Sequence, residues 1–514
     1  MLVLAVLYAT ATAVLFVFGL NQLWLARRHR AQGGLRVRPV EVVPEAWPTV
    51  TVQLPLYNER FVVERLIDAV AQFDYPADKL EIQVLDDSTD DTHHLAAARV
   101  AYWKARGVQI EHVARTERVG YKAGALAHGL QTAKGELIAI FDADFLPLPD
   151  FLKRTVSVLA ADTDLGLVQA RWGHLNDTET VLTRVQAALL DSHFVIEQDV
   201  RNGAGLFMNF NGTAGVWRRA CIDDAGGWQH DTLTEDLDLS YRAQMRGWKF
   251  RYLADTVAPA ELPQTVAVWR KQQFRWSKGS VETAYKLLPA FLKSPLSVRV
   301  KVQGMFHLGG FFVFPAILIA VLLHAPLLVA REIGVGPGNA YFAAMGLGIL
   351  AFMGVVFAHV SAQRALYPDW KKRLRYEPVF LAAALGLAVN NTRGLLEAIV
   401  GHRTPFIRTP KAGEKGGHAA YAPRPDAMVL WVERGLALYS LAGLVALVAT
   451  GAWVGVGFQM MFVGGFGMLG FYDNIQSRVA AAQPVRTHHV VALAKEVVPQ
   501  EVIHVEILPK AKAA

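Results

Sequence analysis

Apolar segments long enough to cross a lipid bilayer limit what this chain can fold into more than any other feature of its sequence. Such segments lie at residues 2–25, 303–329 and 340–361, and an almost unbroken apolar run covers 430–471. About 20 residues suffice to cross a bilayer, so the last run is long enough for a hairpin of two helices that turns near Thr450–Gly451. The sequence therefore predicts about five transmembrane helices.

Basic residues indicate how these helices are oriented. The segment "RRHR" follows the first apolar run, whereas a cleaved signal peptide has its basic residues before the run and a small-residue cleavage site after it. The positive-inside rule then places residue 27 onward on the cytoplasmic side, together with 362–377 and 390–427. The apolar run 378–389 is too short to span and suits an interfacial or re-entrant helix.

The composition supports a membrane protein that also carries a large soluble part. Hydrophobic residues make up 53% and charged residues 19% of the 514 residues, and the net charge is +7. Because the positive charge lies beside the apolar runs, membrane lipids explain it better than nucleic acid does. The single cysteine, Cys221, excludes a disulfide framework. The sixteen histidines, with His93 and His94 adjacent, show no ligand spacing, and we therefore predict no zinc site.

Residues 49 to about 260 have the pattern of an α/β domain. Short apolar runs such as "TVTVQLPLY", "EIQVLDD", "GELIAIFDAD" and "GLVQARW" alternate with segments whose apolar residues recur at helical spacing. Strands that alternate with helices predict a mainly parallel, doubly wound sheet. Ligands bind such sheets at the carboxyl ends of the strands.

Two pairs of carboxylates follow predicted strands and therefore fall at that edge. Asp86 and Asp87 end the run "VLDD", where a turn and a helix N-cap are the simpler explanation. Asp142 and Asp144 end the run "IAIFDAD", and at a strand end both carboxylates are able to converge on one cation. Hard divalent ions such as Mg²⁺ or Mn²⁺ take oxygen ligands and are often shared with substrate phosphates, so a metal bound to a nucleotide diphosphate is the candidate partner.

Two further motifs complete the candidate site. In "TLTEDLDL", Thr234 is placed to cap a helix whose first turn holds Glu235 and Asp236, and one of these carboxylates is a candidate base for an acceptor hydroxyl. In "QQFRWSKGS", Arg275 is placed to clamp a diphosphate while Trp276 stacks on a sugar face. An amphipathic helix on the membrane surface explains the second motif equally well.

The order of these motifs resembles that of the processive members of glycosyltransferase family 2. The segments that carry the resemblance are "QLPLYNE", "VLDDSTD", "GYKAGAL", "FDADF", "FNGTAGVWRR", "TEDLDL", "RGWKF" and "QQFRWSKG". They are closely similar to the plant cellulose-synthase-like A and C classes, which make mannan, glucomannan and xyloglucan backbones, and more distantly to the bacterial cellulose synthase catalytic subunit. The resemblance covers residues 50 to about 290 densely, and it implies a GT-A-type (Rossmann-like) cytoplasmic domain.

The resemblance also implies a role for each motif residue. Asp236 is implied to be the catalytic base, and Asp142 and Asp144 the metal ligands. The donor nucleotide is implied to contact Asp86, Asp87, Lys122, Asp142, Arg275 and, in the gating-loop-like "FIRTPK", Thr409 and Lys411. The acceptor sugar is implied to contact Asn211, Gly212, Thr213, Glu235, Gln272 and Trp276, with Trp217 as a further stacking face.

The implied activity is inverting polymerisation of a nucleotide-activated hexose, with Mg²⁺ or Mn²⁺ as the cofactor. Both UDP-glucose and GDP-mannose remain open as the donor, and the growing polysaccharide is expected to cross the membrane through the spans 303–361 and 430–471, with accessory export subunits as possible partners. Transfer of one sugar to a lipid and a non-catalytic channel or scaffold are the alternatives. The expected location is a bacterial inner membrane with the catalytic domain cytoplasmic.

The predicted organisation has eight parts. These are an N-terminal transmembrane helix (1–26), a linker (27–48), the catalytic domain (49–262), interfacial helices (263–300), two transmembrane helices (301–362), an interfacial helix with the gating-like loop (363–427), two further transmembrane helices (428–472) and a largely disordered tail (473–514).

Overall fold

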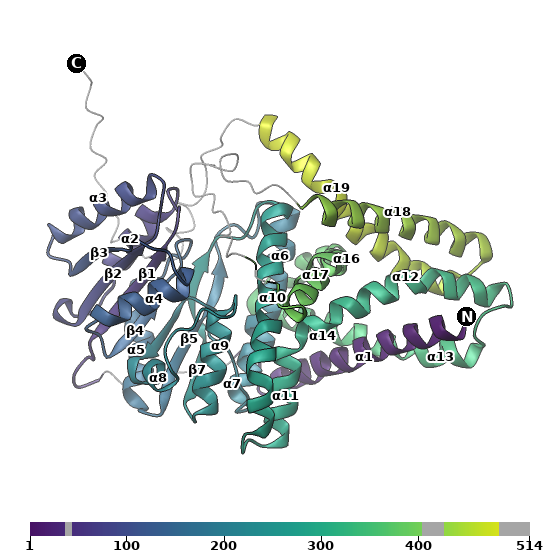
Figure 1. Ribbon diagram of the computed structural model, residues 1–514. Helices are drawn as coiled ribbons and strands as arrows, with labels where there is room; N and C mark the ends of the chain where they lie inside the picture. The colour runs from purple at the N-terminus through teal and green to yellow at the C-terminus, as the bar shows by residue number, and fades with distance from the viewer. Residues whose placement is uncertain (36–43, 403, 405–425, 483–514) are drawn as a thin grey trace.

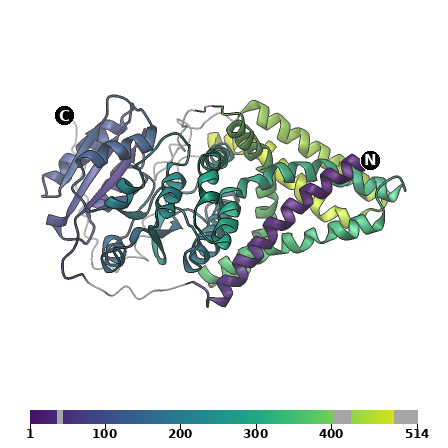
Figure 2. The ribbon, with the colours of Figure 1, turned by 60° about the horizontal axis from the view of Figure 1, so that its bottom comes forward.

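The computed structural model describes residues 1–35, 44–402, 404 and 426–482. Within them the chain forms an α/β domain joined to a group of long helices that extend away from it (Figure 1). The amino terminus lies at the end of these helices that is far from the sheet, in both ribbon views (Figures 1 and 2). The expected division into a soluble part and an apolar helical part is therefore confirmed.

The α/β domain is built on one seven-stranded sheet with the strand order β3-β2-β1-β4-β6-β5-β7. The four neighbouring strands β3, β2, β1 and β4 are parallel, whereas β6 runs antiparallel to both β4 and β5. The sheet is thus mainly parallel, as predicted, with β6 as the exception. The strands are β1 (Val50–Leu56), β2 (Leu80–Asp86), β3 (Ile110–Ala114), β4 (Leu137–Ile140), β5 (Leu165–His174), β6 (Gly215–Arg218) and β7 (Lys249–Ala260).

Both faces of the sheet are buried. The strand β4 is apolar throughout, whereas the buried polar residues of β1 and β2 hydrogen-bond to one another, Thr51 to Glu81 and Gln53 to Gln83. Alternate residues of β4 enter different hydrophobic clusters: Ala139 packs with α2, α3 and α5, whereas Ile138 and Ile140 pack with α4, α8 and α9. Helices therefore cover the sheet on two sides, and the strand ends remain open. These helices are α2 (Val63–Ala71), α3 (Thr92–Lys104), α4 (Tyr121–Thr132), α5 (Phe151–Ala161), α8 (Arg219–Asp224) and α9 (Glu235–Met245).

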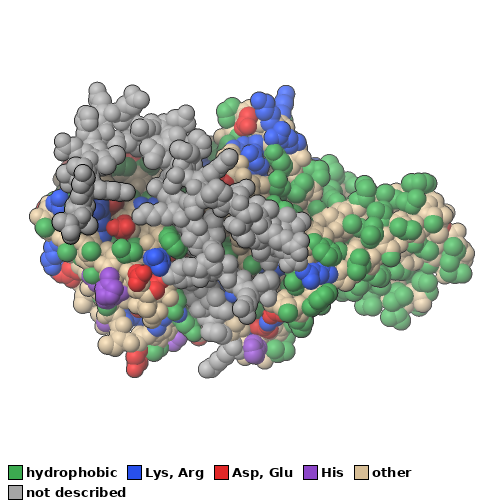
Figure 3. Space-filling model, turned by 90° about the horizontal axis from the view of Figure 1, so that it is seen from above, with side chains coloured by type: hydrophobic (Ala, Val, Ile, Leu, Met, Phe, Trp, Pro, Cys, Tyr) green, Lys and Arg blue, Asp and Glu red, His purple; other side chains and the backbone are tan. Residues whose placement is uncertain are grey.

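The described residues contain six helices that are long and apolar enough to cross a membrane, one more than the sequence predicted. Five of them coincide with the predicted spans, and α18 (Ala427–Thr450) ends at a left-handed Gly451, which confirms the hairpin turn. Hydrophobic side chains gather over the surface of this helical part (Figure 3). The other four are α1 (Leu2–Ala31), Gly310–Glu332 with α12 (Val313–Glu332), Asn339–Leu366 with α13 (Asn339–Gly346) and α14 (Gly348–Leu366), and Trp453–Tyr472 with the start of α19 (Val456–Ala482).

The sixth helical segment, Trp370–Ile399, contains the apolar run that seemed too short to span. It is longer than that run because α16 (Glu377–Gly386) continues almost directly into α17 (Ala388–Ile399), whose asparagines Asn390 and Asn391 are buried against protein. The helix α17 packs along α10 (Val266–Lys293), and α16 packs on α6 (Val181–Ser192) and α19. An interfacial position for this segment stays a prediction.

The helix α10 joins the two parts of the molecule. It carries the "QQFRW" motif, and Arg270 near its start forms a buried ion pair with Glu433 of α18. The Asn390 side chain donates a hydrogen bond to the Arg270 carbonyl oxygen at 3.0 Å, and the Ser277 hydroxyl donates one to the Asn391 carbonyl oxygen at 2.8 Å. A motif of the candidate site is therefore fixed directly to the apolar helices.

Candidate active site

Most of the residues singled out from the sequence line one cleft at the carboxyl ends of the strands. The cleft has a volume of about 170 Å³ and lies where β1, β2 and β4 end and where α4, α9 and α10 meet. The predicted site residues that line it are Asp87, Lys122, Asp142, Asp144, Asn211, Gly212, Glu235, Asp236, Gln272, Arg275 and Trp276. Six sequence motifs that are up to about 190 residues apart therefore meet in one place.

The carboxylate pair after β4 has a positive partner within the protein. The Lys122 ammonium group, in the first turn of α4, lies 2.5 Å from Oδ1 of Asp142 and donates a second hydrogen bond to the Gly212 carbonyl oxygen at 2.8 Å. Burial lowers the pKa of Lys122, but the negative charges of Asp142 and Glu235 outweigh this effect and raise it. Lys122 is thus a fixed cation beside the acidic pair.

Thr213 orients this region from behind the cleft. Its side chain is fully buried, and its hydroxyl oxygen accepts a hydrogen bond from the Asp142 backbone N–H at 2.9 Å. The sequence placed Thr213 among the acceptor contacts, whereas the described structure places it outside the cleft. It holds the loop that carries Asp142.

Gly212 brings the backbone close to the candidate base. Its φ of +82° lies in the left-handed region that favours glycine. A Cβ atom at this position would lie 3.1 Å from Oδ2 of Asp236 and 3.4 Å from Nζ of Lys122. The absence of a side chain therefore leaves room in front of Asp236.

Asp236, the candidate base, has a pKa raised toward neutrality. It lies in the first turn of α9, and its Oδ1 accepts a hydrogen bond from the Leu237 N–H at 2.8 Å. Burial and the neighbouring Glu235 carboxylate raise the pKa of Asp236 to about 7, against the opposing effect of Lys122. Thr234 precedes the helix as predicted, but its hydroxyl group bonds to the Thr283 hydroxyl at 3.1 Å and makes no side-chain cap.

The α10 motif closes the other side of the cleft. Gln272, Arg275 and Trp276 follow one another at helical spacing, so that all three side chains line the cleft. Burial lowers the pKa of Arg275, and the carboxylates of Glu235, Asp142, Asp236 and Asp144 act in the opposite direction. Trp276 also lines a second, larger cavity.

Asn211 is held by a network that the sequence did not reveal. Its side-chain oxygen accepts a hydrogen bond from the Gln198 amide at 2.6 Å, and its amide lies 3.0 Å from Nε2 of His193. Both partners belong to a π-helical segment, His193–Gln198, and such segments are frequent at functional sites. Glu197 in the same segment accepts a hydrogen bond from Gln22 of α1 at 2.7 Å, so a membrane helix reaches this network.

Among the described residues, three that are not glycine have a positive φ, and they lie in the chain next to residues that line the cleft. They are Asn58, Tyr121 and Ala214, with φ values of 57°, 51° and 54°. Such conformations are uncommon and cluster at functional sites. Each belongs to a segment that carried the family resemblance, and each lies within three residues of a side chain that lines the cleft.

Tyr57 and Arg118 line the cleft and were missed by the sequence analysis. The Arg118 guanidinium lies 3.4 Å from the centre of the Tyr57 ring. Tyr57 follows β1 directly, so the strand-end rule was sufficient to find it. Arg118 lies in a loop before α4, where nothing in the local sequence distinguishes it.

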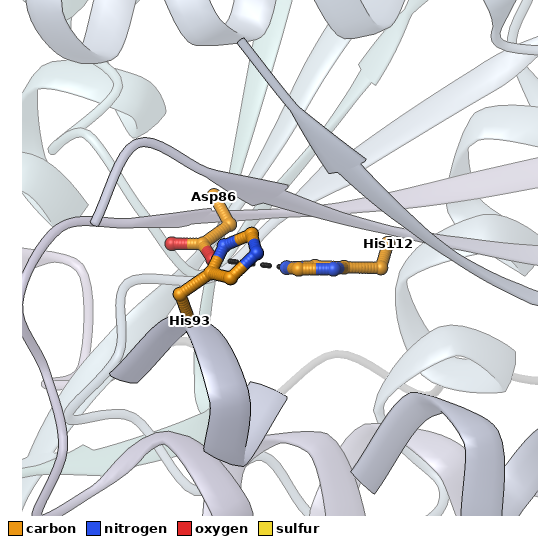
Figure 4. A group of neighbouring side chains, drawn as sticks. All are labelled: Asp86, His93 and His112. Atoms are coloured by element: carbon orange, nitrogen blue, oxygen red, sulfur yellow. Dashed lines mark hydrogen bonds and ion pairs between the residues drawn. The ribbon is translucent and has the colours of Figure 1, made fainter. Parts of the chain in front are cut away.

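Asp86 does not line the cleft. It is 2% exposed, and its Oδ2 lies 2.9 Å from Nδ1 of His93 and 2.9 Å from Nε2 of His112 (Figure 4). Asp87 does line the cleft, where the Arg115 guanidinium binds its carboxylate. The sequence analysis considered His93 only together with the adjacent His94. In the structure His93 instead approaches His112 of β3.

The suggested stacking role of Trp217 is wrong. Its side chain is 0% exposed and packs among Phe210, Trp228 and Phe250 in the core, because β6 points it away from the cleft. The gating-like segment 406–411, with Thr409 and Lys411, lies outside the described residues, as does most of the predicted tail.

A second cavity of about 910 Å³ continues from the cleft into the long helices. The two share Trp172, Leu190, Asn211, Asp236 and Trp276, together with Thr234. Aromatic side chains from several helices line the larger cavity, among them Tyr8, Phe18, Phe306, Phe314, Phe342, Phe352 and Phe458. Among the described lining residues, α1 contributes seven and the predicted 430–471 region three, so α1 has a larger share than expected.

The architecture is that of a GT-A-type glycosyltransferase domain joined to apolar helices. It is similar to the solved mannosyltransferase PcManGT from Pyrobaculum calidifontis, in complex with GDP-Man and Mn²⁺, with a TM-score of 0.52 and 22% identity over 78% of this chain and 100% of that chain. Residues 48–279 match the family model "Glycosyltransferase like family 2", so this part of the chain is a glycosyltransferase family 2 domain.

Plant glucomannan 4-beta-mannosyltransferases are among the most similar relatives. Glucomannan 4-beta-mannosyltransferase 1 of Oryza sativa subsp. japonica is 41% identical over 290 residues, which are 55% of this chain and 55% of that protein. Glucomannan 4-beta-mannosyltransferase 2 of Arabidopsis thaliana is 45% identical over 252 residues, which are 48% and 47% of the two chains. The chain thus matches about half the length of these relatives, and the resemblance to the cellulose-synthase-like A class is confirmed.

Proposed function

We propose that this protein is an inverting β-mannosyltransferase that extends a polysaccharide from GDP-mannose and passes the product into the membrane. One observation carries this proposal: Asp236, with its raised pKa, faces the Lys122–Asp142 group in the cleft and also borders the cavity among the long helices. The names of the plant relatives favour a mannosyl donor over a glucosyl one.

The proposed reaction is a single displacement. Oδ2 of Asp236 accepts the proton of the acceptor hydroxyl group, and the hydroxyl oxygen forms a bond to the anomeric carbon of mannose. The bond from that carbon to the diphosphate oxygen breaks, and GDP leaves. Since the attack comes from the side opposite the leaving group, an α-linked donor gives a β-linked product.

Asp142 and Asp144 fit a hard divalent cation. Both follow β4 in one loop, both offer only oxygen ligands, and Asp144 is 3% exposed, where a second negative charge needs compensation. When bound, Mg²⁺ or Mn²⁺ would stabilise the charge that develops on the leaving diphosphate. Lys122 and Arg275 supply the protein's own positive charge beside the same position.

The remaining cleft residues divide between donor and acceptor in this proposal. Asp87, Tyr57 and Arg118 lie at the ends of β1 and β2 and before α4, where the nucleoside would bind. Asn211 and Trp276 also line the larger cavity, where the acceptor end of the glycan would bind, and Gln272 lies one helical turn before Trp276. Thr213 and Asp86 hold other groups in place and contact neither substrate.

We propose a multi-pass membrane location with the catalytic domain on the cytoplasmic side. The six apolar helices and the basic residues next to them support it. The plant origin of the relatives gives no support to a bacterial inner membrane in particular. The exported glycan leaves along α1, α12 and α14, and accessory export subunits remain candidate partners.

The donor assignment is tested with the purified full-length chain. GDP-mannose and UDP-glucose, each radiolabelled in the sugar, are incubated separately with Mn²⁺ or Mg²⁺, and incorporation into product is counted. We expect incorporation from GDP-mannose that excess chelator abolishes. Incorporation from UDP-glucose alone would overturn the mannosyl assignment, and undiminished incorporation in chelator would overturn the metal assignment.

A further inference from the structure

A second group of ligand-type side chains lies outside the catalytic cleft, at the edge of the sheet. Asp86 ends β2, His93 lies in the first turn of α3, and His112 lies in β3. Oδ2 of Asp86 is 2.9 Å from Nδ1 of His93 and 2.9 Å from Nε2 of His112, and the three atoms all lie within 4.8 Å of one another. Figure 4 shows both rings turned toward the carboxylate.

The spacing of these atoms is close to that of a tetrahedral metal site. Zinc binds histidine nitrogen and carboxylate oxygen at about 2.0–2.2 Å, so two such ligands in a tetrahedral site lie roughly 3.3 Å apart. The two separations from Oδ2 of Asp86, 2.9 Å each, differ from this value by a few tenths of an ångström, and the two histidine nitrogens lie within 4.8 Å of each other. A rotation of the partly exposed His93 ring toward His112 would bring the three atoms around one ion.

The carboxylate is held in the orientation that ligation requires. Its other oxygen, Oδ1, accepts a hydrogen bond from the Ser88 backbone N–H at 2.9 Å, which leaves Oδ2 facing the two histidine rings.

We propose that Asp86, His93 and His112 form a site for a divalent transition-metal ion, with Zn²⁺ the expected occupant, separate from the catalytic cation site. Imidazole nitrogen selects Zn²⁺ over Mg²⁺, whereas the all-oxygen pair Asp142 and Asp144 selects hard ions. The His93 side chain is 42% exposed, so water or a further ligand reaches the fourth coordination position.

Occupation of this site would join three elements beside the donor cleft. The ion would link the end of β2 to α3 and β3, and the next residue after Asp86 is Asp87, which lines the cleft. Binding to the folded chain alone stabilises it by mass action, so Zn²⁺ should raise the unfolding temperature. The site is thus a structural support for the nucleotide side of the cleft.

The test is metal binding by the purified full-length chain, measured by calorimetric titration with Zn²⁺ in the presence of saturating Mg²⁺. The variants are His93→Gln and His112→Gln. The control is His94→Gln, which changes the neighbouring exposed histidine that is outside the group. We expect one Zn²⁺ per native chain, the same for His94→Gln, and at least about tenfold weaker binding for the other two variants, since each removes one of three ligands.

A second measurement separates a true site from adventitious binding. Co²⁺ replaces Zn²⁺ in such sites and gives the strong visible absorption of four-coordinate cobalt, which surface histidines do not produce. The native chain and His94→Gln should show this absorption, and His93→Gln should lose it. Equal Zn²⁺ affinity in the native chain and His93→Gln would overturn the proposal, and so would a native chain that binds no Zn²⁺. Because His93 is partly exposed, its variant is expected to fold even if His112→Gln does not.

Discussion

At the scale of single residues, Asp236 decides whether the cleft is a catalytic site. We expect Asp236→Asn to lower the transfer rate by about 10²–10⁴, because the amide has nearly the same shape and no basicity. Binding of GDP should be unchanged, since the donor groups lie elsewhere in the cleft. The measurement is turnover with GDP-mannose beside GDP affinity for both proteins, and near-native turnover of the variant would contradict the assignment.

The raised pKa of Asp236 also sets a pH dependence. A general base acts when it is deprotonated, so kcat/KM should rise with pH and level off above about pH 7. The same shift destabilises the folded chain as pH rises from about 4 through 7, because the folded state holds the proton that the unfolded state has lost. Asp236→Asn should therefore have a higher Tm than the native chain at pH 8, and a Tm difference that disappears near pH 4. A native rate independent of pH from 5.5 to 8 would refute the base.

Gly212 gives a test of geometry that leaves the charged groups intact. In Gly212→Ala, the added Cβ atom meets Oδ2 of Asp236 at 3.1 Å and φ is +82°, so we expect turnover to fall by roughly 10–100-fold through misplacement of the base. The matched control is Gly205→Ala, which also has a positive φ, +64°, but nothing within 4 Å of its Cβ. Both variants should lose similar stability. Equal turnover in the two would show that the approach to Asp236 is unimportant.

The sequence correctly placed residues in the cleft where a motif ends a strand or begins a helix. Asp142, Asp144 and Asp236 are of this kind, because the strand-end rule places such residues at one edge whatever the rest of the chain does. The sequence also placed Asp86, Thr213 and Trp217 at the substrates, but these side chains do not line the cleft, because their orientation depends on the side chains that surround them. Neighbouring positions in a motif point in different directions, and only packing decides which one faces the substrate.

At the scale of secondary structure elements, α10 connects the cleft to the apolar helices. Its Arg270 is 4% exposed and Glu433 of α18 is 0% exposed, so removal of either charge leaves the other buried without compensation. We expect Glu433→Gln to lower the free energy of unfolding by about 3–5 kcal/mol. Thermal unfolding in detergent measures this change. The control is Arg246→Gln, which breaks the exposed pair with Asp224 and should change the free energy of unfolding far less. Equal losses in the two variants would contradict the role of the buried pair.

Helices and strands were predicted well where a single pattern of hydrophobic residues extends over their whole length. They were predicted poorly where contacts with residues far away in the sequence determine their structure. The spans and the central strands fall in the first group. The antiparallel strand β6, the π-helical segment His193–Gln198 and the helix α17 fall in the second. The polar Asn390 and Asn391 made α17 look exposed in the sequence. They are buried because they hydrogen-bond to residues of α10 that are more than 100 positions away in the chain.

At the scale of the whole molecule, the number of membrane crossings fixes which segments share a side with the cleft. If Trp370–Ile399 lies along the interface, His402 is cytoplasmic and Trp453 is outside; if that segment spans, the two positions exchange sides. Both side chains are exposed, and the natural Cys221 is buried, so single cysteines at these positions can be labelled selectively. We expect a membrane-impermeant reagent added outside to label Trp453→Cys and leave His402→Cys unlabelled. The reverse pattern would establish six crossings.

The account joins transfer and translocation in one chain, and the most direct measurement is the location and size of the product in sealed vesicles. The chain is reconstituted with its catalytic domain facing outward, GDP-mannose and Mn²⁺ are added outside, and the product is treated with endo-β-mannanase before and after detergent. The account predicts a long β-linked mannan inside the vesicles, protected until detergent is added. A single mannose on a lipid, or a polymer fully digested in intact vesicles, would contradict it.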